Sequence, residues 1–206
     1  MTDPKPATRL TILLPAGRLP LPIMAKATEL AQRHNLEVYL STAQNLRLMG
    51  IDEADLPAVK AELAALGAAF KGPGKFPLPR VCIGRRDCST GMQDPQALSA
   101  LIFERFAGTP VKPKFKIAIS GCPLGCPGVM TTDIGLLGTR KGWDLHVGGK
   151  GGPHPRSGRR VLREASDEQV LAAIATLVSY HYAKTGKKQR LAKLVDEPDF
   201  PFPAEA

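Results

Sequence analysis

Two pairs of cysteines constrain this chain more than any other feature of its sequence. They are Cys82-Ile-Gly-Arg-Arg-Asp-Cys88 and Cys122-Pro-Leu-Gly-Cys126, and they use all four cysteines of the 206 residues. The N-terminus reads Met-Thr-Asp-Pro-Lys, with neither a charged-then-apolar leader nor a twin arginine, so we expect a cytoplasmic protein. In that compartment such cysteines are more often metal ligands or reactive thiols than disulfides.

The spacing within the pairs favours an iron–sulfur cluster over zinc. Structural zinc sites usually place two to four residues between paired cysteines, whereas five separate the first pair here. A cluster is bulky and is held by four thiolates, so it tolerates loops of varied length. Gly121, Gly125 and Gly128 would let backbone N–H groups approach its sulfurs. The sequence predicts a [4Fe–4S] cluster, with zinc and free or paired thiols as alternatives, on Cys82, Cys88, Cys122 and Cys126.

Hydrophobic periodicity predicts an α+β fold in two modules with a boundary near residue 75, inside the Gly/Pro-rich connector 71–79. The first module reads strand, helix, strand, strand, helix, which fits a small split βαβ unit. Its elements are expected at 9–14, 20–32, 36–40, 45–48 and 52–66. The second module is expected to hold helices at 95–106 and 167–182 and strands at 115–120, 134–137 and 143–147. Residues 184–206 read as a basic and then Pro-rich tail.

The formal net charge of +9 favours an anionic partner without saying which one. A zinc-stabilised nucleic-acid binder is one reading, motivated by this charge and the basic run 184–193. The chain lacks the interleaved aromatic residues and the motifs of such proteins, so we expect no nucleic acid. We also expect no membrane span, because the apolar stretch 10–24 is broken by prolines and a glycine.

The cysteine loops and their flanks resemble the sirohaem-dependent sulfite and nitrite reductases. The resemblance rests on Ser120-Gly121-Cys122-Pro123-Leu124-Gly125-Cys126 and on the later runs Asp133-Ile-Gly-Leu-Leu-Gly138 and Leu145-His-Val-Gly-Gly-Lys150. The segment Val38-Tyr-Leu-Ser-Thr-Ala-Gln44 is similar to the ferredoxin-like half-domain of that family. Typical members carry two fused repeats, whereas this chain has one, as in the small single-repeat sulfite reductases.

The resemblance implies a ferredoxin-like half-domain at 1–75 and a sirohaem and [4Fe–4S] domain at 76–206. It implies that Cys126 bridges the cluster to the sirohaem iron, where sulfite is reduced to sulfide, or nitrite to ammonia, by six electrons. No Gly-x-Gly-x-x-Gly fingerprint is present, so the electrons are expected from a separate donor protein such as a ferredoxin. The chain is expected to act as a monomer or homodimer. An electron-transfer or accessory subunit without sirohaem is the alternative.

Basic side chains are candidates for holding the anionic substrate and the sirohaem carboxylates. Lys114 and Lys116 are expected to share one face of a strand and to contact substrate, with Arg80, Arg85 and Arg86 as further catalytic candidates. The candidates for cofactor binding, besides Cys126, are Lys150, Arg156, Arg159 and Arg160. A solvated surface role is the ordinary alternative for each of them. His146 and His154 are expected to be structural or surface residues. The early arginine of the family is replaced by Thr11, so we expect Arg9 or a second subunit to complete the site.

Overall fold

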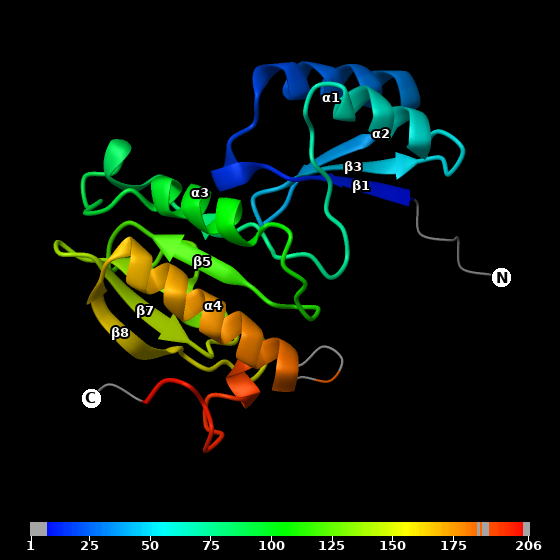
Figure 1. Ribbon diagram of the computed structural model, residues 1–206. Coiled ribbons are helices and arrows are strands. Elements are labelled where there is room, and N and C mark those ends of the chain that lie inside the picture. Colours follow the sequence, from blue (N-terminus) through cyan, green and yellow to red (C-terminus); the bar gives the residue numbers. More distant parts are fainter. Residues whose placement is uncertain (1–7, 185, 187–189, 204–206) are drawn as a thin grey trace. The chain divides into compact units, whose positions relative to one another are not determined.

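The computed structural model describes residues 8–184, 186 and 190–203, and Figure 1 shows the chain as a ribbon. Two compact units make up the chain, Met1–Gly72 and Pro73–Ala206, and each is described by itself. No helix in the described ranges combines the length and apolarity needed to cross a membrane.

The first unit is a three-stranded antiparallel sheet with two helices, shown in blue and cyan in Figure 1. The sheet order is β1-β3-β2, and α1 packs against β2 and β3 while α2 packs against β1. Helix α1 buries Ile23, Ala27 and Leu30, which recur at helical spacing, and its C-cap Asn35 is left-handed. The elements are β1 Thr8–Ile12, α1 Leu21–His34, β2 Glu37–Leu40, β3 Leu46–Ile51 and α2 Leu56–Ala64.

The second unit is built on a five-stranded mixed sheet in the order β4-β5-β6-β7-β8. Strands β4 to β6 are parallel, and β6 to β8 are antiparallel. Helix α3 packs against β4 and β5, and α4 packs against β7. The elements are β4 Arg80–Val81, α3 Pro95–Phe106, β5 Ile117–Ser120, β6 Ile134–Gly138, β7 Trp143–Val147, β8 Arg159–Ala165 and α4 Asp167–Lys184, with short 3-10 turns η2 Gly84–Arg86, η3 Val129–Thr131 and η4 Leu191–Lys193.

Local sequence explains where the main elements of this unit begin. Asp94 caps α3 by accepting the N–H groups of Gln96 and Ala97, and Pro95 occupies its first turn, where a missing N–H costs nothing. All four residues of β5 are buried, as expected for a central parallel strand. The α+β prediction is confirmed.

The C-terminal segment corrects one expectation. Residues 184–206 are not simply a tail, because Leu191, Leu194 and Val195 are buried in the core of the second unit. Their burial removes apolar side chains from water, which stabilises the packed segment. Within the basic run 184–193, residues 185 and 187–189 lie outside the described residues.

Candidate iron–sulfur site

The carboxyl ends of two neighbouring parallel strands bring Cys82 and Cys122 to one edge of the sheet. Cys82 follows β4 directly, and Cys122 comes two residues after the end of β5. The two loops touch, because the Gly121 N–H donates to Cys82 Sγ at 3.1 Å. Cys82 N–H donates in turn to the Ile119 carbonyl at 3.2 Å. Ligands commonly bind at this edge of parallel sheets.

The turn η2 returns Cys88 towards the same edge. The Cys88 N–H donates to the Gly84 carbonyl at 3.0 Å, which fixes the loop between the first two cysteines. The Thr90 hydroxyl lies 3.2 Å from Cys88 Sγ and 3.7 Å from Cys122 Sγ, so one side chain contacts thiols from both pairs. The Thr90 hydroxyl, followed by its backbone N–H, lowers the pKa of the Cys88 thiol. A lowered pKa favours the thiolate, which is the form that binds metal.

Glycines allow the three loops at this edge to approach at backbone distance. Gly84 has φ +70°, and a Cβ there would lie 2.2 Å from Pro95 Cδ. A Cβ on Gly138, at the end of β6, would lie 2.6 Å from the Gly121 carbonyl oxygen. The Gln93 side-chain amide adds a bond of 2.8 Å to the Thr139 carbonyl. The loops that carry three of the cysteines are therefore packed without room for side chains between them.

The fourth thiol differs from the others in its surroundings. Cys126 is exposed, whereas Cys122 is buried and Cys82 and Cys88 are half-buried. Gly125 and Gly128 on either side have φ of +65° and +75°, so the loop turns sharply around Cys126. Unlike the other three thiols, Cys126 Sγ makes no hydrogen bond to a described residue. Among the described residues, no three Cys, His, Asp or Glu side chains are grouped closely enough to hold a single metal ion.

Arg80 is the predicted catalytic residue that the structure places beside the Cys126 loop. A Cβ on Gly128 would lie 3.6 Å from Arg80 Nη2. Burial lowers the pKa of this half-buried guanidinium, and the neighbouring charge of Arg190 lowers it further. The Arg80 side chain has no hydrogen bond or ion pair with any described residue. A partly dehydrated cation of this kind favours an anion at its side.

Arg190 is a residue that sequence reasoning missed. Its Nε donates to Asp133 Oδ1 at 2.8 Å, and its Nη2 donates to the Gly149 carbonyl at 3.1 Å. Asp133 is fully buried and also accepts the backbone N–H groups of Lys116 and Leu191, each at 3.0 Å. An isolated aspartate in an apolar run was the available signal for a buried partner. Nothing in the sequence indicated a residue 57 positions away.

The structure does not bring Lys114 and Lys116 to the cysteines. The expectation that both share a strand face is wrong, because Lys114 has φ +74° and β5 begins only at Ile117. Both side chains are exposed at the amino end of β5, whereas Cys122 follows its carboxyl end. At about 3.3 Å per residue, the six residues from Lys116 to Cys122 span roughly 20 Å.

The other basic candidates fall into two groups. Arg85 and Arg86 are exposed on η2, between the first two cysteines. The remaining arginines have partners within the second unit. Arg156 donates to both carboxylate oxygens of Asp196, at 2.7 and 2.8 Å. Arg159 donates to the Phe202 carbonyl at 2.8 Å, and Arg160 lies 3.6 Å from the Asp144 carboxylate. Their assignment to sirohaem stays a prediction.

Lys150 and the two histidines lie near the loop that follows β7. The backbones of Lys150 and Arg156 exchange hydrogen bonds of 2.8 and 2.7 Å, which closes this loop into a hairpin. His146 points its Nδ1 at the Gly158 carbonyl, 3.4 Å away, and burial lowers the pKa of its imidazole. His154 is exposed. Lys150 therefore lies on an ordered turn, and its role in cofactor binding stays a prediction.

Two family profiles match this chain. Residues 78–200 match the nitrite and sulphite reductase 4Fe-4S domain, and residues 5–66 match the nitrite/sulfite reductase ferredoxin-like half domain. The chain therefore belongs to the nitrite and sulfite reductase family, whose first matched domain spans all four cysteines. This assignment confirms the predicted [4Fe–4S] cluster and the ferredoxin-like half-domain, and it places the chain among oxidoreductases.

Individual relatives agree with this family. The assimilatory-type sulfite reductase of Nitratidesulfovibrio vulgaris is 29% identical over 185 residues, which are 89% of this chain and 84% of that protein. The nitrite reductase [NAD(P)H] of Bacillus subtilis is 31% identical over 144 residues, but the match covers 70% of this chain and only 18% of that protein. The NirA protein of Mycobacterium tuberculosis has the same fold, with a TM-score of 0.74 at 21% identity, over 92% of this chain and 38% of NirA.

Proposed function

We propose that this chain is a single-repeat sulfite reductase, which reduces sulfite to sulfide with a [4Fe–4S] cluster and sirohaem, and for which nitrite is the second candidate substrate. The observation that carries the proposal is the site itself, where the loops that follow β4 and β5 meet and leave Cys126 exposed, with no hydrogen bond from its Sγ to a described residue. The match covers 84% of the Nitratidesulfovibrio vulgaris sulfite reductase, which supports a reductase of similar, single-repeat length. The nitrite reductases that match are far longer.

The residues at the site fit both prosthetic groups. Four thiols suit the cluster, and the exposed Cys126 thiol is the one free to contact a second iron. When bound, sirohaem would supply an iron at which the oxyanion accepts electrons from the cluster. The protein's own part is to hold the thiolates, to keep the loops rigid and to offset negative charge.

Arg80 is the residue that we assign to the anion. Its side chain is half-buried beside Gly128. The charged group that acts on it is the guanidinium of Arg190, and no described acidic side chain neutralises it. A sirohaem carboxylate or the substrate oxyanion would supply the missing charge. Arg85 and Arg86 are second candidates because they flank the cysteines, and Lys114 and Lys116 are weaker ones because of their distance.

An electron-transfer or accessory subunit without sirohaem is the second candidate function. The observation in its favour is a relative named the assimilatory nitrate reductase electron transfer subunit of Bacillus subtilis, 28% identical over 185 residues, or 23% of that protein. In this reading Cys126 would be an ordinary cluster ligand. Either function would use a separate protein partner for electrons, in the cytoplasm.

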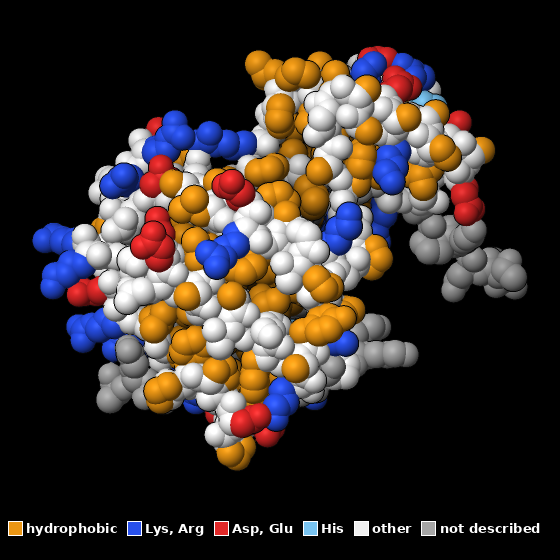
Figure 2. Space-filling view, viewed as in Figure 1, with side chains coloured by type: hydrophobic (Ala, Val, Ile, Leu, Met, Phe, Trp, Pro, Cys, Tyr) orange, Lys and Arg blue, Asp and Glu red, His pale blue; other side chains and the backbone are white. Residues whose placement is uncertain are grey.

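Basic charge alone does not indicate nucleic acid in this chain. On the face shown in Figure 2, Lys and Arg side chains are scattered and interspersed with Asp and Glu. Phosphate backbones are usually bound by a continuous basic surface. The net charge of +9 is therefore better matched to small anions and an acidic donor protein.

An absorption spectrum of the anaerobically purified protein tests the proposal. Haem bands together with the broad cluster absorption are expected for the reductase. Cluster absorption alone, in protein made in cells that supply sirohaem, would favour the electron-transfer subunit. Stoichiometric zinc without acid-labile sulfide would contradict both.

A further inference from the structure

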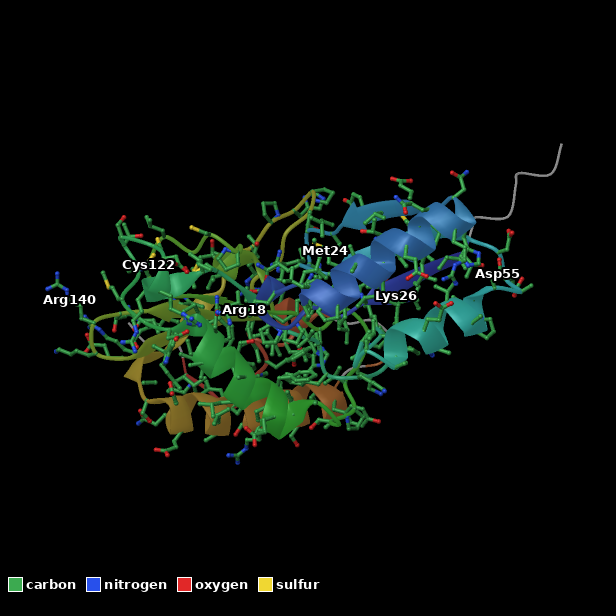
Figure 3. All side chains as sticks on the ribbon, turned by 90° about the horizontal axis from the view of Figure 1, so that it is seen from above. Arg18, Met24, Lys26, Asp55, Cys122 and Arg140 are labelled. Atoms are coloured by element: carbon green, nitrogen blue, oxygen red, sulfur yellow. The ribbon has the colours of Figure 1, made fainter. Side chains whose placement is uncertain are left out.

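Among the described residues, Thr90 is the one whose side chain lies within hydrogen-bonding reach of thiols from both cysteine pairs. Its hydroxyl oxygen is 3.2 Å from Cys88 Sγ and 3.7 Å from Cys122 Sγ, within the reach of hydrogen bonds to sulfur. The Gly91 N–H donates to the Cys88 carbonyl at 3.0 Å, which closes the turn that carries Thr90. Figure 3 shows the described side chains as sticks, with Cys122 labelled.

The direction of this hydrogen bond is fixed once metal is present. A thiolate that ligates iron has no proton, so it can only accept, and the Thr90 hydroxyl must be the donor. Reduction of a cluster adds an electron, which increases the negative charge on its sulfurs. A donor at the sulfur stabilises the reduced form more than the oxidised form, and hydrogen bonds to sulfur are among the factors that set cluster potentials.

We propose that Thr90 is a positioning residue whose hydroxyl raises the reduction potential of the cluster through Cys88 and, less directly, Cys122. This inference rests on the proposed function only for the presence of the cluster and does not require sirohaem. The distances assign the larger share to Cys88, because its sulfur is closer to the hydroxyl by half an ångström.

The test is a redox titration of the holoprotein, followed by the electron paramagnetic resonance signal of the reduced cluster. Thr90→Val replaces the hydroxyl with a methyl group of similar size, Thr90→Ser keeps the hydroxyl, and Thr90→Ala leaves space for a water. Ser89→Ala is the matched control, because Ser89 is the adjacent hydroxyl residue and is exposed like Thr90, whereas the hydroxyl contacts to the Cys88 and Cys122 thiols come from Thr90. Iron and acid-labile sulfide are measured first in every variant.

The expected result is a lower potential in Thr90→Val, with Thr90→Ser and Ser89→Ala at the wild-type value and Thr90→Ala between them. The ratio of reduced to oxidised cluster at a fixed potential should fall about tenfold in Thr90→Val, which corresponds to about 59 mV for one electron. An unchanged potential in Thr90→Val with a full cluster would overturn the inference. If Thr90→Val loses the cluster, Thr90→Ala decides by the same criterion, and loss in both would overturn it in favour of a structural role. A wild-type protein without a cluster would instead overturn the proposed function.

Discussion

The four thiols of the site have unequal surroundings, and this inequality separates their roles residue by residue. Cys82 accepts the Gly121 N–H, and Cys88 and Cys122 contact the Thr90 hydroxyl. Cys126 is exposed, and its Sγ makes no hydrogen bond within the described ranges. Hydrogen bonds to a thiolate offset its charge and fix its direction. A thiolate without them is freer to share its charge with a second iron, which is the role that we propose for Cys126.

Serine substitutions test this division of roles. Cys126→Ser should alter the haem spectrum as well as the cluster signal, because oxygen replaces the shared sulfur. Cys82→Ser should affect the haem only to the extent that the cluster is lost. Absorption and electron paramagnetic resonance spectra at matched iron content check both variants. Normal loading of sirohaem into Cys126→Ser, with an unchanged spectrum, would show that Cys126 is not the bridge.

The partly buried charge of Arg80 leads to a prediction about the rate of sulfite reduction. Arg80→Ala should lower sulfite turnover by about one to two powers of ten, because one charge-assisted contact is worth roughly 1.5–3 kcal/mol. Lys116→Ala is the matched control, since it removes a charge from the same unit at the far end of β5, and it should cost much less. The measurement is sulfite-dependent oxidation of reduced methyl viologen at matched cofactor content. A larger loss in Lys116→Ala than in Arg80→Ala would return the substrate role to the lysines.

Among the helices and strands, the sequence predicts those that have a clear hydrophobic periodicity. The helix expected at 95–106 is α3 as observed, because Asp94, Pro95 and the apolar spacing all mark it. Strands β4 and β8 were missed, since β4 has two residues and β8 interrupts its alternation with charged residues. Four cysteines in two pairs were sufficient to locate the site.

Long-range contacts explain what the sequence could not predict. The left-handed backbone of Lys114 breaks the strand before Ile117, and lysine itself gives no signal of such a conformation. The pairing of Asp133 with Arg190 joins residues far apart in the chain. Thr90 likewise needed the folded arrangement, because only the structure shows which hydroxyl faces the sulfurs.

The close approach of the loops gives a prediction about Gly84, the glycine that begins η2. Gly84→Ala should destabilise the second unit by about 2–4 kcal/mol, because its Cβ would overlap Pro95 in addition to straining a positive φ. Gly74→Ala is the matched control, with φ +71° but no atom within 4 Å of the added Cβ, and should cost about 1 kcal/mol. Urea unfolding and iron content measure the two effects. Equal destabilisation by both variants would mean that packing against Pro95 is unimportant.

At the scale of the whole molecule, the C-terminal segment is part of the second unit. Its Leu191, Leu194 and Val195 complete the core, and Arg190 neutralises the buried Asp133. Breaking a buried ion pair leaves an uncompensated charge, whereas exposed pairs contribute little. The segment therefore contributes to stability as well as placing a positive charge near Arg80.

Arg190→Ala tests this contribution. It should destabilise the protein by about 3–5 kcal/mol, because Asp133 would keep only backbone donors. Arg156→Ala, which removes an exposed pair with Asp196, should cost about 0–1 kcal/mol. The midpoints of urea unfolding, compared between variants whose unfolding free energy has the same dependence on urea concentration, provide the comparison. Similar midpoints for the two variants would contradict the structural role of Arg190.

The proposed reaction is the reduction of sulfite to sulfide through the [4Fe–4S] cluster and sirohaem. Its most direct test is to supply the anaerobic holoprotein with reduced methyl viologen and sulfite, and to count the viologen oxidised for each sulfide formed. We expect steady turnover with six viologens oxidised per sulfide, and no turnover in Cys88→Ala, which cannot hold the cluster. Protein with full cluster and sirohaem that forms no sulfide from sulfite would contradict the proposed function.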